Sequence, residues 1–152
     1  MPKASVKRLI ECKKKDLISL VLDIEKYPEF VPFCFDAKVY ENNDEGDFIK
    51  IIADLTIGKG PFKDTYKSDV IFNKNEDSIH VKNIDGPLNH LSNNWKFFDK
   101  KNGITEVTFD IDFEIKNKFL NTVMEASFKF GLEKIADAFQ KRTAKLFSNS
   151  NN

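Results

Sequence analysis

The sequence predicts an α+β fold in which a curved antiparallel sheet of about seven strands wraps around a long C-terminal helix. Two observations predict this architecture. Short segments of alternating apolar and polar residues, separated by turn residues, fill the middle of the chain. From about residue 117 to 147 the apolar period becomes helical, and such a helix must bury its apolar stripe against the sheet.

The N-terminal segment is expected to form a strand, a short helix and a broken helix. Residues 3–12 alternate as in a strand, and residues 15–25 repeat apolar side chains at helical spacing. The stretch 23–34, DIEKYPEFVPFC, contains Pro28 and Pro32. Proline removes a backbone hydrogen bond and clashes with the preceding turn, so the apolar side chains here lie on a broken segment.

The strands of the middle region are delimited by turn signals, which are NNDEGD, GKGP, NKNED, DGP and DKKNG. Between these turns the alternation is one-sided, as in an antiparallel sheet with one wet face. The rows expected to face the long helix are Ile49, Ile51, Ala53, Leu55 and Ile57; Tyr66, Ser68, Val70 and Phe72; Leu91, Asn93, Trp95 and Phe97; and Val107, Phe109, Ile111, Phe113 and Ile115.

The long helix is expected to cover these rows with an apolar stripe that comprises Leu120, Met124, Phe128, Leu132, Ile135 and Phe139. Gly131 lies in its middle and costs about 1 kcal/mol relative to alanine. Close approach of another segment, space for a ligand, or no functional reason at all would each account for it. Residues 3–147 are expected to form a single domain, followed by a disordered tail at 148–152.

Composition limits the function. The chain has 152 residues, and 24 Lys and Arg balance 24 Asp and Glu, which argues against DNA as a partner. No apolar run reaches the length of a membrane span, and no secretory signal is recognisable at the N-terminus. Cys12 and Cys34 match no redox or zinc spacing, so a reducing, cytoplasmic setting is expected.

The candidate interior offers little for catalysis. Its polar groups are the side chains of Ser68, Asn93 and Tyr66, and no carboxylate is expected to face inward. His80 is expected to face solvent, and His90 follows a turn. We therefore expect no enzyme activity, no catalytic cofactor and no metal.

Aromatic rows that face a helix form either a filled core or the wall of an apolar cavity. The broken segment favours the cavity, because it can present Phe30, Val31 and Phe33 at an opening, where a regular helix would close it. The alternative is that these side chains plug the end of the core.

Two motifs, YPEFVPFC at 27–34 and DGPLNHLSNNWKF at 85–97, resemble the ubiquinone-binding START-domain family. This family includes mitochondrial coenzyme Q-binding proteins and bacterial ribosome-association toxins of the RatA type, and the resemblance runs from about Ser5 to Lys145. Phe33 stands where the family commonly has Trp, and Asn89 and His90 stand where basic residues are common. The matching motif residues are Tyr27, Pro28, Phe30, Pro32, Cys34, Asp85, Gly86, Pro87, Leu91 and Trp95.

The resemblance implies a helix-grip fold, as in START-like and pollen-allergen-like (Bet v 1-like) domains, that binds ubiquinone or a similar isoprenoid lipid in its cavity. It implies a quinone chaperone or carrier that supports respiratory electron transport, cytoplasmic or peripheral on the inner face of the respiratory membrane. The residues expected to bind the ligand are Tyr27, Phe30, Val31, Phe33, Trp95, Phe97, Phe113, Met124 and Phe128.

Two other functions stay open. A RatA-type toxin that interferes with ribosome subunit association would bind the large ribosomal subunit through a basic surface, for which the N-terminal lysines, Lys141, Arg142 and Lys145 are candidates. An aromatic cyclase or dehydratase would need acids or bases inside the cavity, such as a buried Asp54 or Asp69.

Overall fold

The computed structural model describes residues 3–59, 62–86 and 88–147; for residues 59, 62, 120 and 123–130 it describes the backbone alone. The elements in chain order are β1 (Lys3–Ile10), α1 (Lys14–Leu22), the 3-10 helix η1 (Ile24–Glu29), β2 (Cys34–Asp44), β3 (Phe48–Lys59), β4 (Phe62–Asn73), β5 (Ser78–Asp85), β6 (Leu88–Asp99), the 3-10 helix η2 (Lys101–Gly103), β7 (Thr105–Ile115) and α2 (Lys118–Phe147). The expected tail at 148–152 lies outside these residues.

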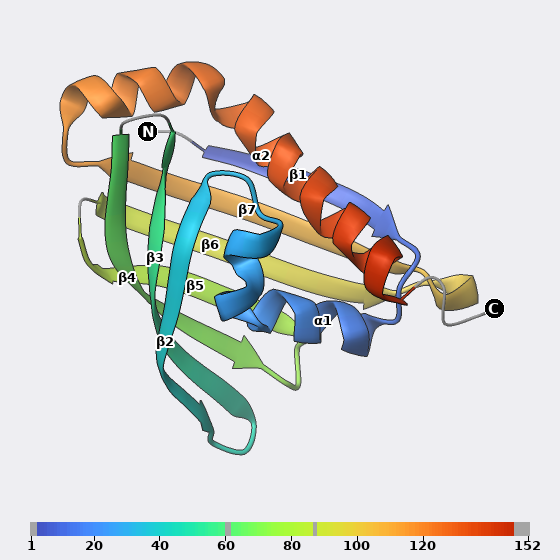
Figure 1. The fold of residues 1–152 in the computed structure, drawn as a ribbon. Helices are drawn as coiled ribbons and strands as arrows, with labels where there is room; N and C mark the ends of the chain where they lie inside the picture. Colours follow the sequence, from blue (N-terminus) through green and yellow to red (C-terminus); the bar gives the residue numbers. More distant parts are fainter. Residues whose placement is uncertain (1–2, 60–61, 87, 148–152) are drawn as a thin grey trace.

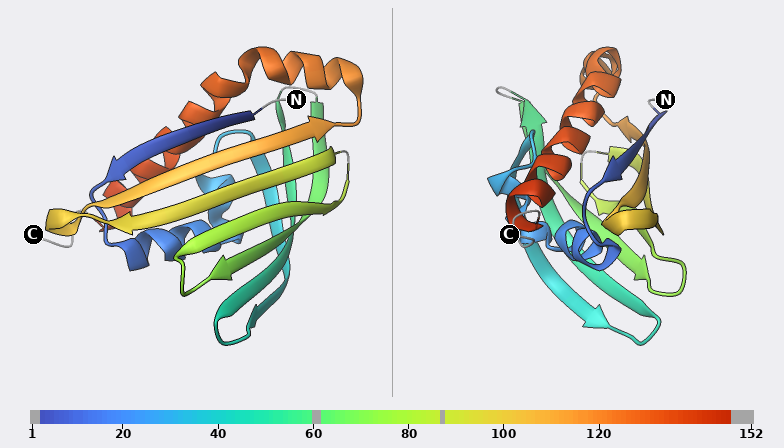
Figure 2. Two further views of the ribbon diagram at one scale, coloured as in Figure 1. Left: turned by 180° about the vertical axis from the view of Figure 1, so that it is seen from behind. Right: turned by 90° about the vertical axis from the view of Figure 1, so that its right-hand side faces the viewer.

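The strands form one antiparallel seven-stranded sheet in the order β1-β7-β6-β5-β4-β3-β2. The N-terminal strand therefore pairs with the last strand, while the other neighbours are consecutive hairpins. The sheet is strongly curved, and α2 lies along its concave side (Figures 1 and 2). We call the face toward α2 the inner face. This arrangement confirms the predicted helix-grip fold.

Side-chain alternation places the predicted rows on the inner face. All of Leu91, Asn93, Trp95 and Phe97 in β6 are buried, as is the row Tyr66, Ser68, Val70 and Phe72 in β4. His80 is exposed, as predicted, and its Nδ1 lies 2.6 Å from Asn94 Oδ1 on the outer face. The period-2 pattern was sufficient here because each strand has one dry and one wet face.

Helix α1 and η1 cover one end of the sheet, which we call the closed end. Helix α1 ends at Leu22, three residues earlier than predicted, and η1 continues the chain with Pro28 inside it. The helix stops because the next residue, Asp23, has φ −84° and ψ 68°, outside the α-helical region. Lys14 Nζ lies 2.8 Å from Asp77 Oδ2 and 3.1 Å from Asp99 Oδ2, and so joins α1 to the strand ends at this end of the sheet.

The opposite end, which we call the far end, is where β3, β5 and β7 finish. The DGP motif lies here, and its glycine is required by a close contact. Gly86 has φ +129°, and a Cβ built on it would lie 2.8 Å from both Cα and Cβ of Tyr66. Asp85 Oδ1 accepts a hydrogen bond of 2.9 Å from the Gly86 backbone N–H. The motif therefore seats the end of β5 directly against Tyr66 in β4.

We expect Gly86→Ala to lower the free energy of unfolding by about 2–4 kcal/mol, because the new methyl group would collide with β4 backbone and the positive φ would be strained. Urea unfolding measures this loss. Gly46→Ala is the matched control, since Gly46 also has a positive φ, +91°, but has nothing within 4 Å of its Cβ position. Equal losses in the two variants would show that the contact with Tyr66 contributes nothing.

Candidate functional site

The interior of the grip is filled at the closed end. The Trp95 ring centroid lies 4.4 Å from that of Phe109 and 5.2 Å from that of Phe139. Phe139 in turn meets Phe30 at 5.1 Å and Tyr27 at 5.6 Å, both edge to face. The remaining space here is a pocket of about 20 Å³, large enough for about one water molecule. No lipid fits beside Trp95.

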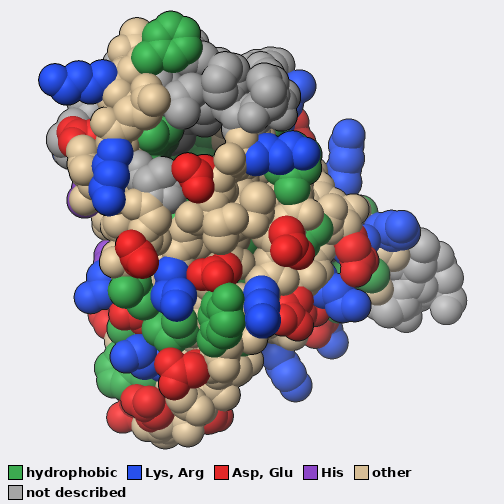
Figure 3. All heavy atoms as spheres, turned by 60° about the vertical axis from the view of Figure 1, so that its left-hand side comes forward, with side chains coloured by type: hydrophobic (Ala, Val, Ile, Leu, Met, Phe, Trp, Pro, Cys, Tyr) green, Lys and Arg blue, Asp and Glu red, His purple; other side chains and the backbone are tan. Residues whose placement is uncertain are grey.

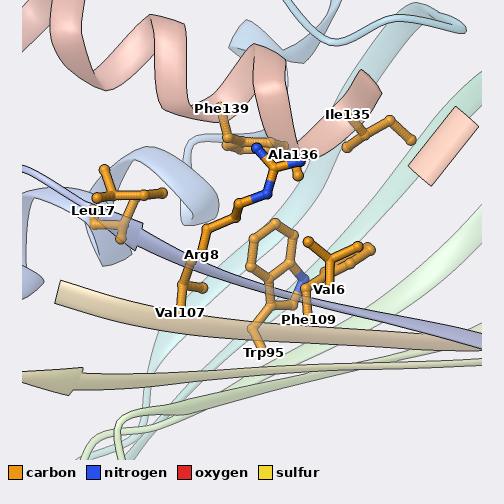
Figure 4. A pocket seen from close by; sticks show the side chains of 10 residues that line it. Val6, Arg8, Leu17, Trp95, Val107, Phe109, Ile135, Ala136 and Phe139 are labelled. Atoms are coloured by element: carbon orange, nitrogen blue, oxygen red, sulfur yellow. The ribbon is translucent and has the colours of Figure 1, made fainter. Parts of the chain in front are cut away.

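Figure 4 shows this pocket, with Arg8 reaching from β1 toward α2 over Trp95 and Phe109. Arg8 Nη1 donates to Asp137 Oδ1 at 2.7 Å and to Gln140 Oε1 at 3.2 Å. On the other side of α2, Arg142 Nη2 donates to Glu29 Oε1 at 2.9 Å. These side-chain contacts link the second half of α2 to β1 on one side and to η1 on the other.

These contacts locate several of the residues that are predicted to bind the ligand. Tyr27, Phe30, Trp95 and Phe97 pack in the closed-end core, and Val31 packs against the same cluster. In this structure Tyr27, Phe30 and Val31 pack against the end of the core, which is the arrangement described by the alternative that the sequence left open. Sequence pattern could not separate the two outcomes, because a core residue and a cavity-lining residue lie on the same apolar row.

The far end of the interior has a different lining. A second apolar cluster faces the first half of α2, and its buried members are Tyr66, Leu88, Leu91 and Phe113, with Leu55, Ile57, Val81, Ile111 and Ile115 packed around them. The backbone from Lys118 to Gly131 spans about 20 Å over this region. Of the predicted ligand-binding residues Phe113 is in this cluster; the side chains of Met124 and Phe128, and Pro87 of the DGP motif, lie outside the described residues.

Phe33 lies at the boundary between the filled and the far-end halves. Its carbonyl accepts a hydrogen bond of 3.0 Å from the backbone N–H of Gly58 in β3. Its ring lies 3.5 Å from the position that a Cβ would take on Gly131 in α2. Phe33 thus links the edge of the sheet to the helix. Its ring is the group that lies next to the glycine in the middle of α2.

The backbone of Phe33 is strained, since its φ of +70° is a left-handed conformation that costs a non-glycine residue about 1–2 kcal/mol. Strain of this kind persists where surrounding contacts impose it, and it is frequent at ligand clamps and switch regions. In Figure 1, α2 changes direction between its first and second halves. Gly131, the single glycine in the α2 sequence, separates these halves.

Polar groups gather beside Phe33. Burial raises the pKa of the Tyr66 hydroxyl, with a smaller contribution from the neighbouring Cys34 thiol. Burial likewise raises the pKa of Cys34 to about 11 and raises that of Tyr27, whose hydroxyl donates to the Val21 carbonyl. These groups stay protonated at neutral pH, so they can donate hydrogen bonds there.

The carboxylates that would favour a cyclase are not on the inner face. Asp69 is 9% exposed, but it lies between the inward-facing Ser68 and Val70 and so projects from the outer face. Asp54 accepts a hydrogen bond from the Tyr40 hydroxyl on the same outer face. Within residues 3–59, 62–86 and 88–147, no three His, Cys, Asp or Glu side chains are grouped to hold a metal ion.

Comparison with known proteins supports the architecture. Residues 13–140 match the family described as polyketide cyclase/dehydrase and lipid transport. A ribosome association toxin RatA of Rickettsia prowazekii is 30% identical over 138 residues, which cover 89% of this chain and 91% of the relative. The mitochondrial coenzyme Q-binding protein COQ10 of Dictyostelium discoideum is 30% identical over 135 residues, which cover 88% of this chain and 64% of that protein.

Among solved structures, a START superfamily protein of Mycobacterium smegmatis superposes with a TM-score of 0.80. It is 17% identical and the match covers 95% of this chain and 98% of the other, so it bears on the fold alone. None of the helices in the described part of the chain has the length and apolar character needed to cross a bilayer. The chain belongs to the polyketide cyclase/dehydrase and lipid transport family and has its START-like helix-grip fold.

Proposed function

We propose that the chain binds an isoprenoid lipid, of which ubiquinone is the best candidate, between the far-end cluster and the first half of α2. The observation that carries this proposal is the division of the interior. Interlocking rings fill the closed end, whereas a second apolar cluster lies at the far end. The first turn of α2 is tied to β7 there, because the Ile115 N–H donates to Asn121 Oδ1 at 3.1 Å.

The energetics of such a site favour a long apolar tail. Each buried CH₂ group contributes about 0.8 kcal/mol, and part of this gain is offset by ordering the tail. The lining offers apolar contacts from five neighbouring strands, β3 to β7. The tail of a lipid with repeated methyl-branched units would contact this surface along the length of the α2 segment above it.

In this proposal Phe33 is the lid of the site. Its ring lies beside Gly131, 3.5 Å from the position that a Cβ would take there. Rotation of Phe33 away from Gly131 would part the sheet edge from α2 and release its strained φ. The lid is thus one side chain on the broken segment, rather than the whole aromatic group expected from the sequence.

The family description and the coenzyme Q-binding name of one relative support a lipid ligand. From these we infer that the chain is a quinone chaperone or carrier for respiratory electron transport, acting in the cytoplasm or on the inner face of the respiratory membrane. We propose no catalytic role and no catalytic cofactor. The inner-face polar side chains Ser68 and Asn93 already donate to the Ala53 and Asp110 carbonyls.

Ribosome association is the second candidate, because several relatives carry the name ribosome association toxin. The basic surface it requires is weakened in this chain, since Arg8, Lys14 and Arg142 are paired with carboxylates. Figure 3 shows basic and acidic side chains interspersed over one face. Co-sedimentation with the large ribosomal subunit at physiological salt would support this candidate.

We expect Phe33→Asp to weaken binding of a short-tailed ubiquinone at least tenfold, because it places a carboxylate at an apolar mouth. Equilibrium dialysis measures the affinity. Phe35→Asp is the matched control, since Phe35 is 46% exposed and its ring lies under the Lys63 ammonium at 4.0 Å. Unchanged affinity in Phe33→Asp would contradict the lid assignment, and global unfolding of that variant would show that Phe33 belongs to the core.

We expect Gly131→Ala to raise the free energy of unfolding by about 0.5–1 kcal/mol, because alanine favours the helix and its methyl group would meet the Phe33 ring at an ordinary contact distance. The added contact should also slow quinone release, which stopped-flow dilution measures. A less stable variant would show that Gly131 is kept for space that another group occupies.

A further inference from the structure

Tyr66 holds a fixed position in the far-end interior. Its residue is 9% exposed, and it belongs to the same cluster as Leu91 and Phe113. Its backbone pairs with Leu55 in β3 and is covered by Gly86, whose missing side chain lets β5 lie directly on the Tyr66 Cα. The backbone of Tyr66 is therefore held by contacts with both neighbouring strands.

The Tyr66 hydroxyl makes no hydrogen bond within the described part of the chain, whereas the other polar groups of the inner face are engaged. Tyr27 donates to the Val21 carbonyl, and Trp95 Nε1 donates to Asn93 Oδ1 at 2.9 Å. A hydroxyl on an apolar wall that has no protein partner can donate to a polar atom that a ligand brings. Retention of this hydroxyl on an apolar wall points to a partner that arrives with a ligand.

The surroundings define the headgroup that would supply this partner. The Cys34 thiol and the Tyr27 hydroxyl lie within electrostatic range of Tyr66, next to the Phe33 lid. The arginines that flank the interior, Arg8 and Arg142, are already paired with Asp137 and Glu29. Since these two arginines are engaged, the side chains that the structure describes around this site favour a neutral hydrogen-bond acceptor over an anionic headgroup.

We infer that the Tyr66 hydroxyl donates a hydrogen bond to the carbonyl oxygen of a neutral ring headgroup and selects quinone-type lipids over hydrocarbons of the same shape. This inference rests on the proposed lipid site and names its specificity-determining residue. Burial keeps Tyr66 protonated, and therefore a donor, throughout the neutral pH range. The headgroup would lie beneath Phe33, with the tail running under the first half of α2.

Tyr66→Phe tests this inference, because it removes the hydroxyl and keeps the ring. The probes are a short-tailed ubiquinone and a benzene ring that carries the same tail, each measured by equilibrium dialysis. We expect the variant to bind the quinone about three- to tenfold more weakly than wild type and to bind the hydrocarbon equally well. Urea unfolding of the ligand-free variant should show stability equal to or above that of wild type, because an unpartnered hydroxyl has been removed.

Tyr40→Phe is the matched control, since the Tyr40 hydroxyl bonds to Asp54 on the outer face. Quinone affinity unchanged by Tyr66→Phe would overturn the inference and leave the lipid site standing. Equal weakening for both probes would overturn it as well, because Tyr66 would then contribute packing alone. A wild-type protein that binds neither probe would overturn the proposed site and the inference with it.

Discussion

The packing of Phe139 against Trp95, Phe30 and Tyr27 is the interaction on which the rest of the structure depends. It brings together the long helix, the centre of the sheet and the proline-broken segment in one set of edge-to-face contacts. Such ring pairs contribute about 0.5–1.5 kcal/mol beyond the area they bury. The Arg8–Asp137 and Arg142–Glu29 pairs lie on either side of this cluster and set the helix over the sheet.

Fixing one half of the helix in this way defines the role of the other half. The segment of α2 that precedes Gly131 extends from the anchored part toward the far-end cluster, and Phe33 lies at the junction between the two halves. The strained φ of Phe33, the helix glycine Gly131 and the Tyr66 hydroxyl, which has no hydrogen bond within the described residues, all occur within this region. Residues that depart from the choices most favourable for folding are expected at functional sites, and here such residues lie close together.

The strand rows, the long helix and the buried faces followed from periodicity, because each element has one dry side. The positions of Trp95 and Phe30 in a filled core did not, since packing depends on which rows meet across the grip. The same limit applies to Gly86. The sequence predicted its turn but not its contact with Tyr66, which joins residues twenty positions apart on different strands. The left-handed φ of Phe33 gave no sequence signal, because phenylalanine rarely adopts it.

The central claim is that the far end of the grip holds a lipid. Organic extraction followed by mass spectrometry of the protein purified from a quinone-containing host tests it most directly. The account predicts ubiquinone or a related isoprenoid lipid at close to one molecule per chain. A protein that is empty and also fails to take up added quinone would contradict it, and would show that the far-end cluster is filled core like the closed end.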